Sequence, residues 1–295
     1  MTFSVIIPVY NDNGTLQRCL QSVMAQSEED YEVIIIDDGS DNKVEIDDTE
    51  KVHVIRIEHR GLSAARNAGI DIARGEYLVF LDADDCIGGD TLSVLAETTR
   101  KYPDSDIIEY PIHVHEGAPD AYMLNFEDKI YDNLIDDYWL GCKAYMHSYV
   151  CNKVYKRHLF DEARFPVGRK FEDAYTLPLL LNKASSVCTV SKGLYHYMWN
   201  VNGICGMADG NDLSQLLKSH INTADMFKLE NRNGFSEFFM YMLNIQIDVY
   251  RACKNIILPS YKIHSFPMNF NMKVKFLLYK IFGLKIVCRL WKHLS

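Results

Sequence analysis

Apolar runs recur along the first part of the chain at the spacing of buried strands. Each run is five to seven residues long, and the first three are rich in β-branched side chains, which is typical of strands buried on both faces. The four clearest runs are residues 3–9, 32–36, 52–57 and 77–81. Because proline cannot donate a hydrogen bond to a sheet ladder, we expect Pro8 to lie at the end of its strand.

Segments with helical periodicity separate most of these runs. Residues 14–26 repeat apolar side chains at positions i, i+3, i+4 and i+7, and Ser63 can cap a helix whose small residues allow close packing on a sheet. A further helix begins after Asp90 and ends at Tyr102-Pro103, and residues 106–112 predict a fifth strand. This alternation predicts an α/β fold with a mostly parallel sheet flanked by helices.

Carboxylates follow two of the predicted strands. Asp37 and Asp38 end the second strand, and Asp82, Asp84 and Asp85 end the fourth. Parallel sheets bind ligands at the carboxyl ends of their strands, so these acids should meet at one edge. Such oxygen ligands suit Mg²⁺ or Mn²⁺, which bind one or two carboxylates together with substrate phosphates. The alternative is a solvated acidic turn that caps the next helix.

Composition narrows the class of protein. The chain has 295 residues, of which 48% are hydrophobic and 24% charged, and its net charge is −9. These values are ordinary for a globular protein and argue against nucleic-acid binding. The eight cysteines form no Cys-x-x-Cys pair, so they predict reduced thiols in a cytoplasmic protein. We find no signal peptide and no uncharged run of transmembrane length.

The alternation stops after residue 115. Glu172 and Asp173 precede an apolar helical segment, where the helix dipole favours an ionised carboxylate. An aromatic run at 195–199 suggests a strand in the core, although it could also be a platform for a sugar. His113 and His115 could ligate a metal, but histidines that alternate along a strand are more often structural. Residues 211–257 are predicted to be helical throughout.

Five segments together resemble a known family. They are Val5-Ile-Ile-Pro-Val-Tyr-Asn11, Ile34-Ile-Ile-Asp-Asp-Gly-Ser40, Gly61-Leu-Ser-Ala-Ala-Arg-Asn-Ala-Gly69, Phe80-Leu-Asp-Ala-Asp-Asp85 and Phe171-Glu-Asp173. In order and spacing they closely resemble the family 2 glycosyltransferases, which have the Rossmann-like GT-A fold. The resemblance covers about the first 205 residues. It implies inverting transfer of a sugar from a nucleotide-diphosphate donor, with UDP favoured, to a hydroxyl of a glycan or lipid-linked saccharide acceptor.

The resemblance also implies a role for each site residue. Pro8 and Tyr10 would line the nucleobase pocket, Asp38 would bind the uracil edge, and Arg66 would reach the base or the diphosphate. Asp82 would contact the ribose, Asp84 would ligate Mn²⁺ or Mg²⁺, and Asp173 would be the catalytic base. Supporting positions would be Asn11, Asp37, Asp85 and Glu172.

The expected chemistry agrees with these roles. Inversion needs one base that removes the proton of the acceptor hydroxyl, and a metal can stabilise the charge of the leaving diphosphate. The resemblance indicates a hexosyl- or N-acetylhexosaminyltransferase of surface polysaccharide synthesis. The alternative is a non-catalytic nucleotide-sugar-binding protein with the same fold. One departure from the family is that no Arg or Lys lies between Lys192 and Lys218, so the metal and Arg66 would carry more of the diphosphate charge.

The expected organisation has three parts. Residues 1–115 would bind the nucleotide sugar, residues 116–205 the acceptor, and residues 206–295 would form a helical C-terminal extension. The segment 272–294 mixes apolar residues with Lys and Arg and carries no acid, which favours peripheral contact with the anionic inner face of the cytoplasmic membrane. The alternative is a C-terminal helix packed on the protein with its lysines extended into solvent.

Overall fold

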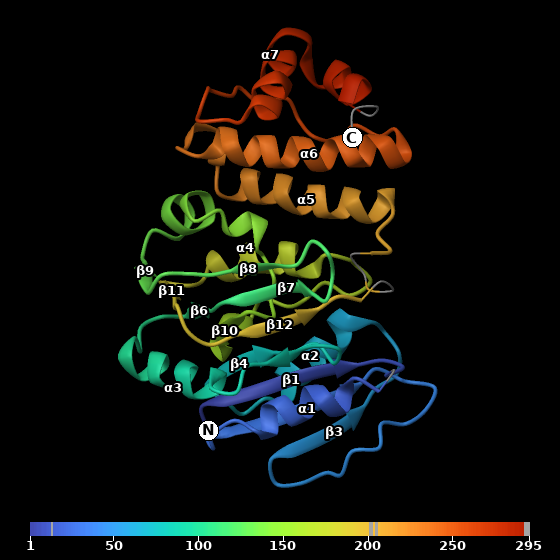
Figure 1. The fold of residues 1–295 in the computed structure, drawn as a ribbon, viewed down its shortest axis with the longest axis vertical. Coiled ribbons are helices and arrows are strands. Elements are labelled where there is room, and N and C mark those ends of the chain that lie inside the picture. The colour runs from blue at the N-terminus through green and yellow to red at the C-terminus, as the bar shows by residue number, and fades with distance from the viewer. Residues whose placement is uncertain (13, 201–202, 204–205, 292–295) are drawn as a thin grey trace. The chain divides into compact units, whose positions relative to one another are not determined.

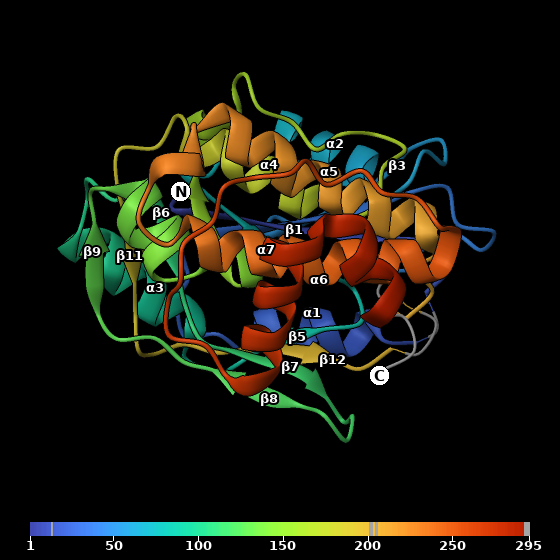
Figure 2. The same ribbon diagram turned by 90° about the horizontal axis from the view of Figure 1, so that it is seen from above.

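The computed structural model describes residues 1–291 except 13, 201, 202, 204 and 205, and it divides into two compact units. The sheet unit consists of Met1–Leu134, Tyr149–Gly168 and Leu179–Val201. The helical unit consists of Ile135–Ser148, Arg169–Pro178 and Asn202–Ser295. Figure 1 labels the elements of both units, and Figure 2 shows them from above.

An eight-stranded sheet with the order β3-β2-β1-β4-β10-β6-β11-β9 is the centre of the sheet unit. The first four strands are all parallel, as the sequence predicted, and β10 joins them antiparallel to β4 and β6. Their bounds are β1 (Phe3–Val9), β2 (Tyr31–Asp37), β3 (Val52–Arg56), β4 (Tyr77–Phe80), β6 (Ile107–Glu109), β9 (Lys129–Tyr131), β10 (Lys153–Lys156) and β11 (Val187–Thr189). Every residue of β1, β2 and β4 is buried, because layers of side chains cover both faces.

Helices cover both faces of this sheet. Residues of α1 (Leu16–Met24) pack in one core with Val5 and Ile7 of β1. On the opposite face, α2 (Leu62–Ile72) approaches β1 so closely that a Cβ added at Gly69 would lie 2.5 Å from Cγ2 of Ile6. The small residues predicted to allow close packing therefore do so. The unit also contains α3 (Thr91–Lys101) and the short helix η3 (Arg157–Phe160).

Three local expectations need correction or refinement. Ser63 is not the N-cap, because α2 begins at Leu62 and Gly61 caps it with a left-handed φ of 89°. The predicted fifth strand at 106–112 is not one strand: it contains β6 (Ile107–Glu109) and the first residue of β7 (Ile112–Glu116), which belong to different sheets. Pro8 is the sixth of seven residues of β1, and pairing with β4 ends two residues earlier at Ile6, so its missing N–H interrupts no ladder there.

A second sheet of four strands, in the order β5-β12-β7-β8, belongs to the same unit. Its strands are β5 (Cys86–Ile87), β7 (Ile112–Glu116), β8 (Tyr122–Leu124) and β12 (Tyr195–Met198). Tyr195 is completely buried, so the aromatic run does begin in the core, whereas Trp199 is 38% exposed. Since β5 follows the acids of the fourth strand directly, this sheet holds the chain just beyond them.

Long helices make up most of the helical unit. They are α5 (Gly210–Met226), α6 (Phe235–Cys253) and α7 (Phe270–Trp291), with the short helices η1 (Leu134–Gly141), η2 (Ala144–Met146) and η4 (Leu229–Asn231). The prediction of continuous helix over 211–257 is wrong, since the chain turns between α5 and α6 with Gly234 at a φ of 84°. Helix α4 (Glu172–Leu181) begins in this unit.

Helix α7 packs against α6 and is broken at Gly283, where φ is 73° and ψ is 178°. It buries Phe276, Tyr279 and Val287 but leaves Phe270, Leu277, Ile281 and Phe282 exposed. Residues 292–294 of the predicted membrane-contacting segment lie outside the described residues. Among the helices that the structure describes, none has the length and apolar character needed to cross a membrane.

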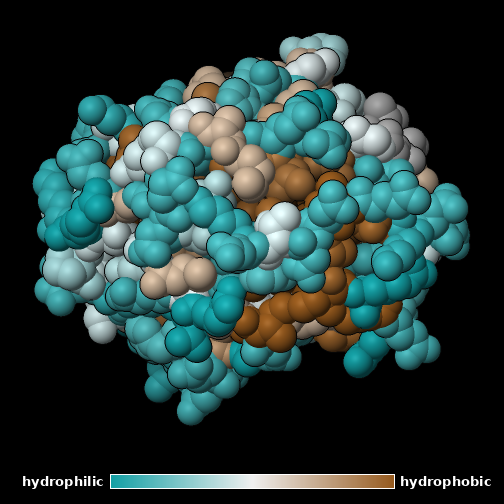
Figure 3. All heavy atoms as spheres, turned by 90° about the horizontal axis from the view of Figure 1, so that it is seen from below, coloured by the Kyte–Doolittle hydropathy of each residue, from teal (hydrophilic) through white to brown (hydrophobic). Residues whose placement is uncertain are grey.

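The outer strand of the large sheet is less completely covered than its centre. Val54 and Ile55 of β3 are only partly buried, and β3 pairs with a single neighbour. Seen from below, where β3 lies in Figure 1, the surface carries a band of hydrophobic side chains bordered by hydrophilic ones (Figure 3).

Candidate functional site

Asp82, Asp84 and Asp85 follow β4, and we call them the acidic strand end. Asp85 is almost completely buried, and its two oxygens accept hydrogen bonds from the Tyr195 hydroxyl at 2.7 Å and the Met198 amide at 2.8 Å. Burial, with the charges of Asp82 and Asp84, raises the pKa of Asp85 well above its usual range. Because both oxygens are occupied by β12, Asp85 supports the turn.

Asp82 and Asp84 are more accessible than Asp85. An oxygen of Asp82 lies 2.8 Å from a guanidinium nitrogen of buried Arg66, whose group also lies 5.4 Å from the centre of the Phe165 ring. Asp84 accepts a hydrogen bond of 3.0 Å from the Asn200 side chain. Burial and the neighbouring charge of Asp82 raise the pKa of Asp84. Burial and a neighbouring like charge are both expected at a cation site, because a bound cation removes the free-energy penalty that they place on the ionised carboxylate.

The carboxyl end of β2 holds the loop that precedes α2. The buried carboxylate of Asp38 accepts hydrogen bonds from the amides of Arg60 at 3.0 Å and Gly61 at 2.8 Å. Nδ1 of His59 lies 2.9 Å from this carboxylate and 3.0 Å from the main-chain oxygen of Asp38. The His59 ring stacks on Tyr10, with centroids 4.1 Å apart and planes inclined by 22°. Tyr10 is 48% exposed, so one aromatic face remains available at the end of β1.

The supporting residues Asp37 and Asn11 tie the loops after β1 and β2 together. Asp37 is buried, accepts from the Ser40 amide at 2.8 Å and forms an ion pair with Arg56 at 3.1 Å. Asn11, which has a left-handed φ of 48°, donates its main-chain N–H to the Ser40 hydroxyl at 2.9 Å. The structure thus brings the predicted residues of β1 and β2 to one edge of the sheet, and Pro8 lies opposite Ile36 there.

Glu172 and Asp173 begin α4 and belong to the helical unit. The preceding Phe171 has a left-handed φ of 54°, which turns the chain sharply into the helix. Asp173 accepts a hydrogen bond of 2.7 Å from the Ala174 amide, and Glu172 is buried. A carboxylate in the first turn of a helix is stabilised in its ionised form by the helix dipole.

The donor atoms at the acidic strand end fit a divalent cation. Asp82 and Asp84 offer hard carboxylate oxygens, which Mg²⁺ and Mn²⁺ prefer. Two guanidinium groups lie nearby, those of Arg66 and of Arg18, which donates to the Asp84 carbonyl at 2.6 Å. The charges of Asp82 and Asp84 raise the pKa of Asp85, and a bound cation would offset the repulsion among these carboxylates.

Sequence reasoning assigned no site role to four residues of this network. Arg18, His59, Tyr195 and Asn200 come from three different segments, and of these only Tyr195, in the aromatic run, stood out by residue type. Each becomes visible only when the fold places it beside an acid. His59 and Tyr195 touch residues that the motifs had indicated, Asp38 and Asp85.

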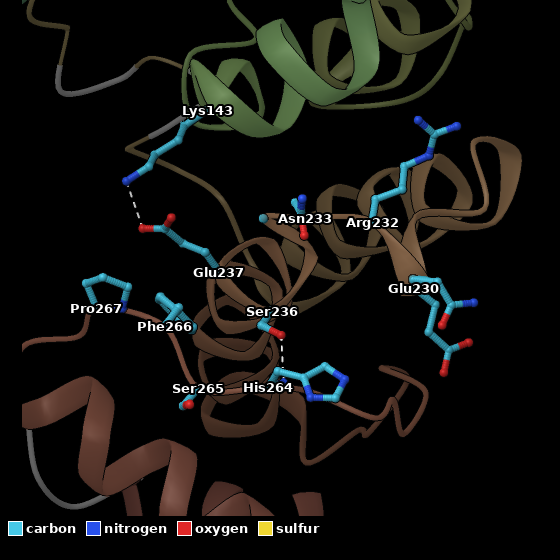
Figure 4. Close-up of a pocket in the computed structure, with 12 residues that line it drawn as sticks. Lys143, Glu230, Arg232, Asn233, Ser236, Glu237, His264, Ser265, Phe266 and Pro267 are labelled. Carbon is cyan, nitrogen blue, oxygen red and sulfur yellow. Dashed lines mark hydrogen bonds and ion pairs between the residues drawn. The ribbon is translucent and has the colours of Figure 1, made fainter.

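The helical unit has an open pocket of about 700 Å³ between the start of α6 and the segment before α7. Figure 4 shows Glu237 facing Lys143, and these two form an ion pair of 2.7 Å, while Ser236 accepts from the His264 amide at 2.8 Å. Arg232 is paired with Asp136 at 2.8 Å. No residue predicted from the sequence lines this pocket, and its main charges already have partners.

The sequence profile described as glycosyl transferase family 2 matches residues 4–163, which is more than half of the chain and includes the acidic strand end. The chain belongs to this family. Relatives include the glycosyltransferase GlyA of Streptococcus pneumoniae, 32% identical over 209 residues, and the minor teichoic acid biosynthesis protein GgaA of Bacillus subtilis, 32% identical over 212 residues. Each match covers 66% of this chain, but only 30% of GlyA and 46% of GgaA.

The fold agrees with this assignment. The structure of Staphylococcus aureus TarS residues 1–349 in complex with UDP-GlcNAc superimposes with a TM-score of 0.61 at 20% identity. The match covers 85% of this chain and 81% of the TarS chain. The predicted GT-A fold, with a mostly parallel sheet, flanking helices and C-terminal helices, is therefore confirmed.

Proposed function

We propose that the chain is an inverting glycosyltransferase that moves a hexosyl or N-acetylhexosaminyl group from a UDP-sugar to a hydroxyl of a glycan or lipid-linked acceptor in surface polysaccharide synthesis. The observation that carries the proposal is the convergence of an exposed aromatic face, a guanidinium group and an acidic cluster at the carboxyl ends of β1, β2 and β4. Membership of the family and relatives named for teichoic acid biosynthesis support it.

The base-binding part of the proposed donor site is the Tyr10–His59 stack. Its exposed tyrosine face suits stacking with a planar pyrimidine, and stacking of a base on an aromatic ring is worth about 1–3 kcal/mol. Pro8 would line the same pocket. Asp38 orders the loop through Arg60 and Gly61, and its remaining lone pairs would accept from the imide N–H of uracil.

The diphosphate part would use Asp82, Asp84 and the two guanidinium groups of Arg66 and Arg18. Asp82 would bind the ribose hydroxyls while Arg66 holds its orientation, and Asp84 would hold the divalent cation. When bound, that cation would neutralise the diphosphate and stabilise the charge of the leaving group. Arg18, which the sequence did not single out, supplies positive charge that the loop after β12 lacks.

Asp173 would remove the proton of the acceptor hydroxyl. Its hydrogen bond with the Ala174 amide anchors the carboxylate at the helix start. Glu172 is buried beside it and would fix the start of α4. A single base of this kind is what an inverting transfer requires.

We further propose that α7 contacts an anionic membrane surface through its exposed apolar residues and lysines. Ile281 and Phe282 are 68% and 57% exposed, although other residues of the helix are buried against the protein. The full chain should pellet with vesicles that contain anionic lipid, and Ile281→Ser with Phe282→Ser should reduce the bound fraction. Equal pelleting of the wild type and the double variant would refute membrane contact by this helix.

The donor test is a thermal-shift screen of nucleotide sugars with and without Mn²⁺, because a ligand that binds the folded state raises its stability by mass action. We expect a UDP-sugar to give the largest shift. Asp84→Ala should remove the Mn²⁺-dependent part of the shift, whereas Asp120→Ala, at an exposed position of the same unit, should retain it. A screen in which no nucleotide sugar stabilises the protein would contradict the donor site.

The catalytic test separates binding from transfer. Asp173→Asn should retain the donor-induced shift but lose transfer by about two to four orders of magnitude, which is the usual contribution of a general base. Wild-type transfer by this variant would rule out Asp173 as the base. Donor binding by the wild type without sugar transfer or hydrolysis would favour the non-catalytic binding protein instead.

A further inference from the structure

Two histidines and a glutamate meet on one face of the second sheet. His113 lies on β7, His196 lies on β12, and Glu116 is the last residue of β7. One oxygen of Glu116 lies 2.7 Å from Nδ1 of His196 and 3.2 Å from Nδ1 of His113. One ligand atom from each of the three residues lies within 4.8 Å of the others.

The backbone explains how Glu116 reaches the histidines. His196 pairs directly with His113 in the parallel ladder, so the two side chains share a face of the sheet. Glu116 is three positions from His113 and would normally point to the other face. A bulge between the pairs of His196 and Met198 shifts the register, and His115 has a left-handed φ of 55° there. This bulge turns Glu116 back toward the histidines.

His115, which the sequence offered as a possible ligand, is used differently. Its ring packs 4.9 Å from the Trp199 ring and 5.3 Å from the Tyr197 ring, measured between centroids. The residue therefore contributes its backbone conformation and an aromatic contact. The possible metal ligands are instead His113, Glu116 and His196.

We propose that His113, Glu116 and His196 form a binding site for a transition-metal ion of the zinc class. Two imidazoles and one carboxylate are a ligand set that suits Zn²⁺, with water in the fourth position. A tetrahedral ion with bonds of about 2.0–2.1 Å separates its ligand atoms by about 3.3 Å. The Glu116–His113 distance of 3.2 Å is close to this value, and the Glu116–His196 distance of 2.7 Å would lengthen slightly around an ion. Each side chain is 28–33% exposed, so an ion can enter from solvent.

The site is separate from the acidic strand end. Tyr195, adjacent to His196 in β12, points to the opposite face of the strand, where its hydroxyl binds Asp85. An ion held by His196 and His113 would brace β12 against β7 at the point where β12 supports Asp85. The proposal rests on the geometry of the second sheet and does not depend on the proposed glycosyl transfer.

The test is zinc binding by the full-length protein after chelator treatment. Zn²⁺ alone is titrated in competition with a fluorescent zinc indicator, and the melting temperature is followed in parallel. We expect one zinc ion that raises the melting temperature. His196→Gln and the isosteric Glu116→Gln should each weaken this binding at least about tenfold, since even indirect changes around metal ligands cost 10–100-fold in affinity.

Two controls separate this site from others. Asp84→Ala, which alters the acidic strand end, and His158→Gln, at an exposed histidine outside the cluster, should both retain the zinc affinity of the wild type. Circular dichroism checks that each variant is folded. The proposal is overturned if wild-type protein binds no zinc, if both ligand variants bind zinc as tightly as the wild type, or if Asp84→Ala alone abolishes binding.

Discussion

Tyr195 offers a direct test of how the acidic strand end is held. Its side chain is fully buried, its hydroxyl donates to Asp85 at 2.7 Å, and the same oxygen accepts from the Asp82 amide at 3.2 Å. Tyr195→Phe removes only this hydroxyl and leaves the ring packing. Tyr110→Phe is a matched control, because Tyr110 is equally buried in the same unit but donates to a neutral acceptor, the Cys151 carbonyl, at 3.1 Å.

The expected loss follows from the charge of the acceptor. A hydrogen bond to an ionised group contributes about 1.5–3 kcal/mol, whereas one between neutral groups contributes about 0.5–1.5 kcal/mol. At a pH above the folded pKa of Asp85 we therefore expect Tyr195→Phe to reduce the free energy of unfolding by about 2 kcal/mol and Tyr110→Phe by about 1 kcal/mol. Urea unfolding measures both values, and the slope with urea should not change.

The pH dependence gives a second, independent check. Burial raises the pKa of Asp85 in the folded protein. The folded state therefore takes up a proton more readily than the unfolded state does. As the pH falls through the folded pKa, Asp85 becomes neutral and the free-energy penalty for burying its charge disappears. Loss of the Tyr195 hydroxyl raises that pKa further. The excess cost of Tyr195→Phe should therefore shrink as the pH falls through the folded pKa of Asp85. Equal costs for the two tyrosines at every pH, or an excess that does not change with pH, would refute the reasoning.

Two further predictions concern buried charge and buried histidine. Lys153 and Glu109 are fully buried, and their charged atoms lie 2.8 Å apart. Lys153→Met should reduce the free energy of unfolding by about 3–5 kcal/mol, because it leaves the Glu109 carboxylate uncompensated. Adding Glu109→Leu should restore most of this loss, as measured by urea unfolding. A double variant no more stable than Lys153→Met would contradict this account. Burial lowers the pKa of His220 from 6.5 to about 3, so the folded state keeps it neutral while the unfolded state protonates below about 6.5. His220→Phe should remove about 2 kcal/mol of the stability loss between about pH 7 and pH 5, and an unchanged acid sensitivity would exclude His220 as its source.

The acidic residues show how far sequence reasoning reaches. That Asp38 and Asp82 follow buried strands is visible in the pattern, because apolar β-branched runs have a recognisable length and the acids interrupt them. Parallel strands align their carboxyl ends, so the meeting of these acids at one edge was predictable. The hydrogen-bond partners of these acids were not predictable. The amides of Arg60 and Gly61 reach Asp38, and the Arg66 guanidinium reaches Asp82, because of the conformation of the loop before α2 and of the first turns of that helix.

The histidines of the second sheet show the opposite limit. In the sequence Glu116 follows His113 by three positions, and an odd offset places two residues on opposite faces of a regular strand. The bulge at His115 reverses that arrangement. The sequence does not predict this bulge, because a left-handed conformation is expected mainly of glycine and the residue here is a histidine.

The sequence by itself determined the parallel strands, the acids at their ends and the family, because those depend on local periodicity and on motifs within single segments. The tertiary structure decided which acid is buried and which is open. Asp85 is buried and Asp84 only partly so, and β12, more than a hundred residues away along the chain, covers Asp85 with the Tyr195 hydroxyl and the Met198 amide. Contacts between such distant segments depend on how strands pair across the sheet, and no single segment of the sequence determines that pairing.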